Sequence, residues 1–395
     1  MTNSEFYVSA SPHIHNKKSR SVQKIMLYVI IALLPTTIWG IIAFGWRAFL
    51  VVAVSILSAM LTEFLCDLLL KKPSSLKDLS AVVTGLLVGL NMSSAVPLYV
   101  PIIASVFAIA VCKMTFGGLG QNWINPALGG RVFVMFSFTN AINRYVIPRF
   151  LDGVYIGESV SSASLSSASL SSASVSSASV SSASTMTSSI LSGATPLSYI
   201  KGLGESGLSV TNALQSADYP VSSFAYKIFE VLHINPYYTD AFIGNIGGTI
   251  GEVSALCLII GAIFLLCTKV ITYHIPVSFI ASFMIFTWIW GGVPSGLGVF
   301  HGDALYGILT GGFLLGALFM ATDMVTTPIT KKGQVIFGIG CGFFTFLFRY
   351  FASLSEGVSI AIILMNMCVP FIDRCTRPRV YGHFKEKKAK KEVKA

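Results

Sequence analysis

The sequence predicts an all-α polytopic membrane protein with about ten transmembrane helices, arranged as two inverted five-helix halves with a long extracytoplasmic loop between them. Three observations predict this fold. First, 53% of the 395 residues are hydrophobic and 11% are charged, whereas about a quarter of the residues in a soluble domain are charged. Second, many apolar runs approach the roughly 20 residues that a helix needs to cross a bilayer. Third, basic residues cluster at alternate ends of these runs, as the positive-inside rule describes.

The apolar runs are continuous rather than alternating, which favours helices over a membrane barrel. Two shorter runs, 79–93 and 127–141, contain internal glycines, a pattern typical of discontinuous or tilted helices at a binding site. The other runs have about the length of a bilayer span and cover residues 25–44, 48–70, 96–115, 246–268, 272–291, 304–322, 335–354 and 357–373.

The basic clusters orient these helices, because Lys and Arg near span ends collect on the cytoplasmic side. With ten spans, the clusters fall before the first span and after even-numbered spans. They comprise Lys17, Lys18, Arg20 and Lys24, then Lys71, Lys72 and Lys77, then Lys113, Lys269, Lys331 and Lys332, and finally Arg374, Arg377 and Arg379. Both termini are therefore expected in the cytoplasm. The formal net charge of +10 is interpreted as topology, and no nucleic-acid partner is expected.

This topology divides the chain into five parts. They are a cytoplasmic arm at 1–24, a first transmembrane half at 25–141, an extracytoplasmic loop at 142–245, a second transmembrane half at 246–373 and a basic cytoplasmic tail at 374–395. Because each half has five spans, the second begins on the opposite side of the membrane and the halves are inverted. The stretch "DLSAVVTGLLVGLNM" from Asp78 is faintly similar to "DALYGILTGGFLLGALFM" from Asp303, each at the third span of its half.

Two segments of the long loop differ in character. Residues 161–185 repeat five-residue units such as "SSASL", which bury too little to hold a core, so a disordered tether is expected, with a small β-solenoid as the alternative. Residues 192–195 read Ser-Gly-Ala-Thr. Small neighbours leave the Thr195 hydroxyl accessible to a bulky group, and Pro196 fixes the following backbone. Taken alone, this short motif is more typical of a polar turn than of an attachment site.

Charged residues inside the spans are the other candidate functional residues, because a charge buried in lipid must be paired with an opposite charge or be in contact with water. Asp323 stands out among them, since neighbouring threonine hydroxyls suit an ion or cofactor pathway; a helix cap or an ion pair is the alternative. The loop "GQNWINPA" contains Asn122 and Asn125 and predicts either a re-entrant turn lining a pocket or a plain turn. The seven cysteines include no Cys-x-x-Cys pair, so no metal site is expected. The charged residues within or at the ends of the predicted spans are Glu63, Asp67, Glu252, Asp323 and Arg349.

Several stretches together resemble a known family. They are "SPHIHNKKSRSVQKIMLYVIIALLP", "GGLGQNWINPALGGRVF", "ATDMVTTPIT" and "SGATPL". The chain resembles the family of Rnf ion-translocating oxidoreductase D subunits and the related B subunits of sodium-pumping NADH:quinone oxidoreductases. The resemblance covers nearly the whole chain apart from the serine repeat, and the "SPHI" opening favours the Rnf type.

The resemblance implies a flavoprotein in a bacterial cytoplasmic membrane. FMN would be joined through its phosphate to Thr195, and the complex would pass electrons in a ferredoxin- and NAD-linked chain coupled to sodium or proton translocation. It also implies partner subunits of the A, B, C, E and G types and a flavin-attaching transferase for maturation. By analogy with the B subunit of the sodium-pumping NADH:quinone oxidoreductase, a second, non-covalent flavin is expected. One departure is Ser189, where many flavinylation sequences carry an acid.

The flavin chemistry belongs to the cofactor, so no catalytic side chain is expected. A transporter or channel for a small solute, with inverted repeats and no flavin, is the alternative function, and a structural anchor for partner subunits is a third. Covalent flavin discriminates between them.

Overall fold

The computed structural model describes residues 21–71, 75–146, 148, 195–197, 207, 209–216, 219–352 and 357–377, and the regular structure within these ranges is helical. The serine repeat at 161–185, Ser192, Ser189, and most of the arm and tail lie outside the described residues. Of the Ser-Gly-Ala-Thr motif, Thr195 is described, together with Pro196 and Leu197.

A first group of helices precedes the long loop. Local capping explains several of their starts: the Ser21 side chain accepts a hydrogen bond from the Lys24 N–H, and Asn125 caps a helix that has Pro126 in its first turn, where a missing N–H costs nothing. The group comprises α1 (Val22–Phe44), α2 (Trp46–Leu69), η2 (Leu76–Asp78), α3 (Ser80–Leu90), α4 (Tyr99–Val106), the π-helix η3 (Phe107–Met114), α5 (Pro126–Ser137) and α6 (Thr139–Ile142).

Three helices of the long loop and a second group follow. The loop helices are α8 (Val210–Ser216), α9 (Ser223–Leu232) and α10 (Pro236–Ile243). The second group comprises α11 (Ala255–Cys267), α12 (His274–Trp290), α13 (Ala304–Leu309), α14 (Phe313–Leu315), the π-helix η4 (Gly316–Met320), α15 (Lys331–Phe351) and α16 (Val358–Thr376).

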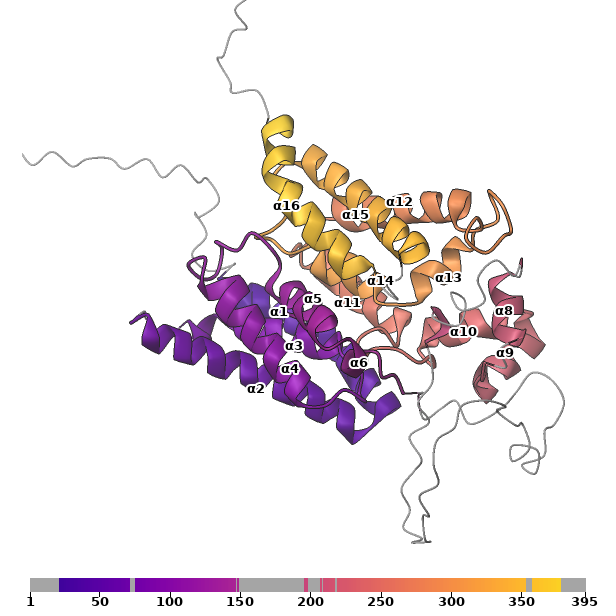
Figure 1. Ribbon diagram of the computed structural model, residues 1–395, viewed down its shortest axis with the longest axis horizontal. Coiled ribbons are helices and arrows are strands. Elements are labelled where there is room, and N and C mark those ends of the chain that lie inside the picture. The colour runs from indigo at the N-terminus through magenta and orange to yellow at the C-terminus, as the bar shows by residue number, and fades with distance from the viewer. Residues whose placement is uncertain are drawn as a thin grey trace, which may run out of the picture.

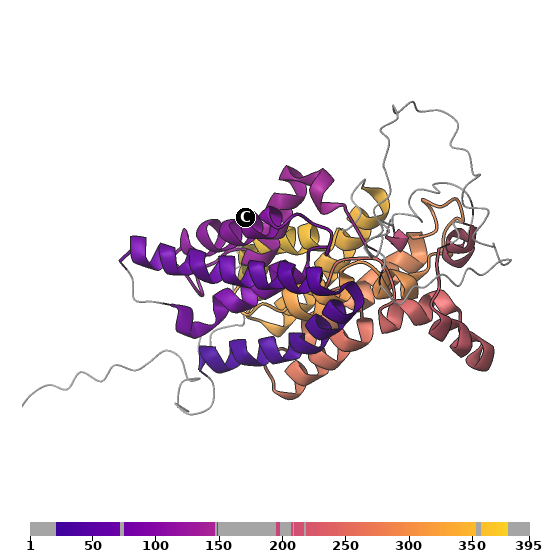
Figure 2. The same ribbon diagram turned by 90° about the horizontal axis from the view of Figure 1, so that it is seen from below.

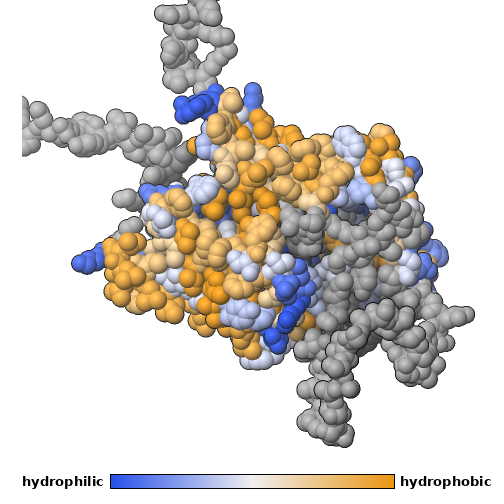
Figure 3. Space-filling view, in the orientation of Figure 1, coloured by the Kyte–Doolittle hydropathy of each residue, from blue (hydrophilic) through white to orange (hydrophobic). Residues whose placement is uncertain are grey.

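Four of the described helices are long and apolar enough to cross a membrane: α1, α2, α15 and α16. Shorter apolar helices accompany them, namely α3, the continuous α4–η3 segment, α11 and α12. On the face drawn in Figure 3, hydrophobic residues cover most of the helical surface and hydrophilic residues gather towards its edges. Length, composition and surface together describe a polytopic membrane protein.

The two groups lie side by side, and α8–α10 project at one end of the molecule (Figures 1 and 2). The contact between the groups, here called the seam, is formed by α1 against α11 and α5 against α16. Close approach at the seam depends on glycine: a Cβ built on Gly261 of α11 would lie 2.2 Å from the Ala32 carbonyl oxygen of α1. One continuous core of buried apolar residues joins both groups.

Of the two glycine-containing runs, one is unbroken and the other is interrupted: α3 is continuous, whereas α5 and α6 are separated at Phe138, inside the run 127–141. The chain stays helical through Gly85 and Gly89 of α3 and through Gly130 of α5; a Cβ on Gly85 would lie 2.7 Å from Ile56 Cα. These glycines permit packing rather than interrupt a helix.

Two further breaks lie in the second group. The run expected at 304–322 is divided between α13 and α14, where Gly311 and Gly312 have φ of 58° and 34°, a region open to glycine. The run expected at 246–268 becomes regular helix only at Ala255, and residues 246–254 form a non-helical connection.

Candidate functional site

Thr195 lies in a small pocket that it forms with the connection before α11 and the break after α13, here called the Thr195 pocket. The threonine is 7% exposed. The walls come from three segments far apart in sequence: residues 195–197, the connection before α11 and the break after α13. The lining residues are Thr195, Pro196, Leu197, Ile246, Gly247, Gly248, Glu252, Val253, Thr310 and Gly311.

The connection before α11 is fixed to the end of α3 by backbone hydrogen bonds. Ile250 N donates to Met92 O at 2.9 Å, and Gly251 N donates to Leu90 O at 2.7 Å. A Cβ on Gly251 would lie 2.8 Å from Leu90 Cβ, so a side chain there would push the non-helical connection away from α3. One wall of the Thr195 pocket is therefore positioned by the first group of helices.

The loop helices hold the other end of this connection. Gly247 N donates to the Tyr219 hydroxyl oxygen at 3.0 Å. Asp240 accepts hydrogen bonds from Ser222 N at 2.9 Å and from Asn245 Nδ2 at 3.3 Å. Burial raises the pKa of the Asp240 carboxyl, and the hydrogen bonds from Ser222 oppose that shift. Helices α8–α10 thus support the glycine-lined wall of the pocket.

A buried ion pair connects the Thr195 pocket to α5. Arg131 Nη2 lies 3.5 Å from Glu252 Oε1, and Arg131 Nη1 donates to Asn91 Oδ1. Asn91 Nδ2 in turn lies 3.7 Å from Met320 Sδ. A charge-paired polar cluster therefore crosses the seam directly behind the pocket.

The Thr195 hydroxyl is the attachment point that the family resemblance implies for FMN. Thr195 supplies a hydroxyl, Gly247, Gly248 and Gly311 leave the opposite walls without side chains, and Arg131 offsets the charge of Glu252. The cavity itself, at about 10 Å³, holds a group no larger than a water molecule. Both the phosphate and the ring of an FMN attached to Thr195 would therefore lie outside this cavity.

Asp323 lies in a second and larger pocket, here called the Asp323 pocket, which has a volume of about 110 Å³. Its walls come from α1, α3, α5, α11 and η4. Apolar side chains form most of the lining, and the polar groups are Ser80, Thr84, Lys113, Asn122, Asn125, Thr322 and Asp323. The loop "GQNWINPA" therefore does line a pocket, and its Asn125 also caps α5.

The threonines around Asp323 make different contacts. Thr326 Oγ1 donates to Asp323 Oδ2 at 3.3 Å, whereas Thr327 Oγ1 donates to the Asp323 backbone carbonyl at 2.8 Å. Thr322 Oγ1 donates to Leu318 O within its own helical turn. The Asp323 carboxylate also accepts a hydrogen bond from Val325 N at 3.4 Å. It therefore stabilises the local turn that follows it and at the same time lines the pocket.

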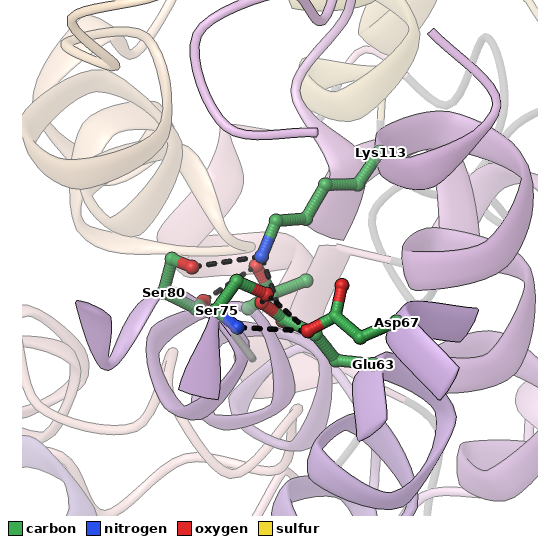
Figure 4. Close-up of polar contacts among 6 residues, drawn as sticks. Glu63, Asp67, Ser75, Ser80 and Lys113 are labelled. Carbon is green, nitrogen blue, oxygen red and sulfur yellow. Dashed lines mark hydrogen bonds and ion pairs between the residues drawn. The ribbon is translucent and has the colours of Figure 1, made fainter. Parts of the chain in front are cut away.

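Figure 4 shows a buried charge cluster that borders the Asp323 pocket. Lys113 Nζ lies 2.6 Å from Glu63 Oε2 and 2.7 Å from Ser80 Oγ. Ser75 Oγ lies 2.5 Å from Glu63 Oε1 and 2.8 Å from Asp67 Oδ2, so the two carboxylates share its single proton. Glu63 is 0% and Lys113 2% exposed. The cluster thus buries two carboxylates and one ammonium.

The intramembrane charges named from sequence therefore fall into separate settings. Glu63 and Asp67 join the Lys113 cluster, Glu252 lines the Thr195 pocket, and Asp323 has its own pocket. Arg349 donates to backbone carbonyls. The structure does not bring Thr195 and Asp323 into one site. Sequence reasoning did not assign Arg131 or the ion-pair role of Lys113; a charge within the run 127–141 was the available signal for Arg131.

Comparison with known proteins gives consistent matches over nearly the whole chain. The model of the NQR2, RnfD, RnfE family matches residues 7–382. The chain is similar to the D-type subunit of the Na(+)-translocating ferredoxin:NAD(+) oxidoreductase complex of Acetobacterium woodii, with 36% identity over 390 residues, 98% of each chain.

Two further relatives match over similar lengths. The D-type subunit of the proton-translocating ferredoxin:NAD(+) oxidoreductase complex of Clostridium ljungdahlii is 35% identical over 377 residues, 95% of this chain and 96% of the relative. The D-type subunit of the ion-translocating oxidoreductase complex of Stutzerimonas stutzeri is 34% identical over 368 residues, 92% of each chain.

Proposed function

Because the chain belongs to the NQR2, RnfD, RnfE family, we propose that it is a membrane subunit of an Rnf-type complex that couples electron transfer between ferredoxin and NAD to ion translocation. The names of relatives matched over more than nine-tenths of both chains support this assignment. The partners would be the A, B, C, E and G type subunits.

The redox centre of this subunit would be FMN joined by a phosphoester to Thr195. The observation that carries the proposal is the position of Thr195 in a glycine-lined pocket formed with the connection before α11 and the break after α13. When bound, FMN accepts and donates single electrons. Thr195 would tether it, a flavin-attaching transferase would form the bond, and Arg131 would keep the charge of Glu252 balanced beside the phosphate.

The Asp323 pocket is the proposed ion site. A carboxylate, amide and hydroxyl oxygens suit a hard monovalent cation or a hydrated proton, and about 110 Å³ accommodates several water molecules at roughly 10–15 Å³ each. A second, non-covalent flavin would require this pocket to widen, because sites for drug-sized molecules occupy about 300 Å³ or more. The relatives named for sodium and for protons leave both ions as candidates.

We propose ten membrane crossings in two inverted halves, with the Thr195 loop outside a bacterial cytoplasmic membrane and both termini inside. The matching order of the two groups supports this arrangement, since α1–α5 and α11–α16 each contain a broken or short helix at the third place. The ends of α15 agree with it, because Lys331 and Lys332 begin that helix on the proposed cytoplasmic side.

In-gel flavin fluorescence tests the redox assignment. The purified complex should show a fluorescent band for this subunit after denaturing electrophoresis, and Thr195→Ala should abolish it without loss of assembly. Thr211→Ala is the matched control, because Thr211 lies in the same loop on α8 and is absent from the pocket lining. A dark wild-type band from a host with the transferase would favour a solute transporter without flavin.

A further inference from the structure

A pocket at the seam lies between the start of α1 and the end of α11 and has a volume of about 210 Å³. Lys24 of α1 and Lys269, just after α11, line it together with the hydroxyl-bearing side chains of Tyr28 and Thr268; the other lining residues are apolar. Among the described residues, no carboxylate lines the pocket and Lys269 forms no ion pair. This pocket, here called the lysine pocket, is therefore positively charged.

Lys269 occupies a backbone position where glycine is usual. Its φ is 55°, in the left-handed region that is unfavourable for a residue with a Cβ. Lys269 N donates to Leu266 O and Val270 N donates to Leu265 O, both at 3.0 Å. These two hydrogen bonds close a helix end around a left-handed residue, which is most often glycine. The turn after α11 would form more easily with glycine, so what lysine adds at this place is a positive charge on the wall of the pocket.

An exposed apolar face leads away from the lysine pocket along α1. Leu27 and Ile31 follow Lys24 by three and seven residues, a spacing that places all three on one face of a helix. The side chains of Leu27 and Ile31 are 42% and 40% exposed. The Tyr28 ring packs edge to face against Phe264 of α11, with 6.0 Å between the centroids. The two helices therefore present positive charge at one end and, next to it, an apolar surface that a bilayer would cover.

A phospholipid matches this combination of features. We propose that the lysine pocket binds the phosphate of an anionic phospholipid whose acyl chains lie along Leu27 and Ile31. The ammonium groups of Lys24 and Lys269 would offset the phosphate charge, and the Tyr28 hydroxyl would donate a hydrogen bond to it. Basic pockets between transmembrane helices on the cytoplasmic side are typical head-group sites, and both lysines are on that side in the topology proposed above. The volume of the pocket also leaves space for water molecules beside the phosphate, at roughly 10–15 Å³ each.

The apolar face of α1 distinguishes a lipid from a free anion. A phosphate ion from solution would use the lysines and gain nothing from that face, so the structure favours the lipid as the source of the phosphate. The lysine pocket also borders the Asp323 pocket, because Ile25, Val270 and Met324 line both. The positive charge of the lysines would disfavour a cation in the neighbouring pocket, and a bound phosphate would offset that charge. This last consequence, unlike lipid binding itself, rests on the function proposed above.

Thermal unfolding of the purified full chain in a non-ionic detergent tests the proposal. Dioleoyl phosphatidylglycerol should raise the unfolding temperature of the wild-type protein, because a ligand that binds only the folded state stabilises it. Dioleoyl phosphatidylcholine, which has no net charge, should raise it less at the same concentration. Lys269→Gly should need about fivefold more phosphatidylglycerol for the same rise, since a lysine near an anionic lipid surface contributes about that factor to affinity. A Lys269→Gly protein with the wild-type dependence on phosphatidylglycerol overturns the inference.

Lys71→Gly is the matched control and should keep the wild-type dependence on phosphatidylglycerol. Lys71 also has a left-handed backbone, with φ 52°, and is exposed after α2 on the proposed cytoplasmic side, but it does not line the lysine pocket. Glycine suits both backbones, so neither substitution should prevent folding. Lys269→Asn, which also tolerates this conformation, replaces Lys269→Gly if that protein does not accumulate.

Two further results would contradict the proposal. An equal loss in Lys269→Gly and Lys71→Gly would indicate a general attraction between the lipid and the basic surface. Stabilisation by inorganic phosphate but not by phosphatidylglycerol would indicate a site for a free anion. None of these measurements involves flavin, so their outcome is independent of the proposed redox function.

Discussion

Arg131 on α5 and Glu252 before α11 form an ion pair across the seam, with 3.5 Å between Nη2 and Oε1. Both side chains are nearly buried, at 8% and 3% exposed. Glu252 lines the Thr195 pocket, and Arg131 also donates to Asn91. The pair therefore connects the first group of helices to the wall of the proposed flavin site.

Arg131→Met should destabilise the protein by about 3 kcal/mol, because removing one partner of a buried pair leaves a buried charge without its counterpart. Thermal unfolding of the purified protein in detergent measures the loss. The double variant Arg131→Met/Glu252→Gln should recover part of it, since coupled sites are not additive. If the losses from Arg131→Met and Glu252→Gln simply add in the double variant, the two residues do not interact.

Gly261→Ala should separate α1 from α11, because the added Cβ would lie 2.2 Å from Ala32 O, a backbone atom. We expect a loss of about 1–3 kcal/mol from overpacking. Gly340→Ala in α15 is the matched control: its Cβ would meet the Met365 side chain, which can move, and the substitution favours helix by up to about 1 kcal/mol. Equal unfolding temperatures for the two variants would argue against tight packing at the seam.

Asp323→Asn should impair ion uptake by reconstituted complexes more than Asp67→Asn does. Asp323 faces a pocket of about 110 Å³, whereas Asp67 is 4% exposed and accepts two hydrogen bonds from Ser75. Uptake into proteoliposomes driven by reduced ferredoxin measures the difference. Wild-type uptake by the Asp323→Asn complex would remove Asp323 from the ion pathway.

Ser171→Cys, within the serine repeat, should make the protein reactive towards an impermeant thiol reagent in intact spheroplasts once the seven native cysteines have been replaced. The reason is the proposed extracytoplasmic position of the loop. Lys331→Cys is the control, because Lys331 is exposed on the proposed cytoplasmic side, and this variant should react after lysis only. The reverse pattern would invert the topology.

Hydrophobic composition was sufficient to predict helices and a polytopic membrane protein, because each run of about 20 apolar residues is a local property of the chain. Helix interruptions were harder to place. Glycines in α3 and α5 serve close packing, while the non-helical connection at 246–254 is held by hydrogen bonds to Met92 and Leu90. Its Gly-Gly dipeptide was a local signal, but the hydrogen-bond partners lie about 160 residues earlier in the chain.

The residues that line the two pockets were recognised from sequence only in part, for the same reason. A motif marked Thr195, and a charge in an apolar run marked Asp323. Lys113 was interpreted as a boundary lysine because it ends such a run, yet it is buried against Glu63, fifty residues earlier in the chain. Two residues that pair over such a distance are not separated by any characteristic interval, so a single sequence does not reveal the pair.

Peptide mass spectrometry tests the central claim, that Thr195 carries FMN, most directly. The complex would be purified from a host with the flavin-attaching transferase and digested, and the peptide containing Ser192 to Lys201 would be fragmented. We predict the mass of FMN less one water, located on Thr195, with the same peptide unmodified in Thr195→Ala. An unmodified wild-type peptide from a complex that still transfers electrons, or a flavin located on Ser192, would contradict the account.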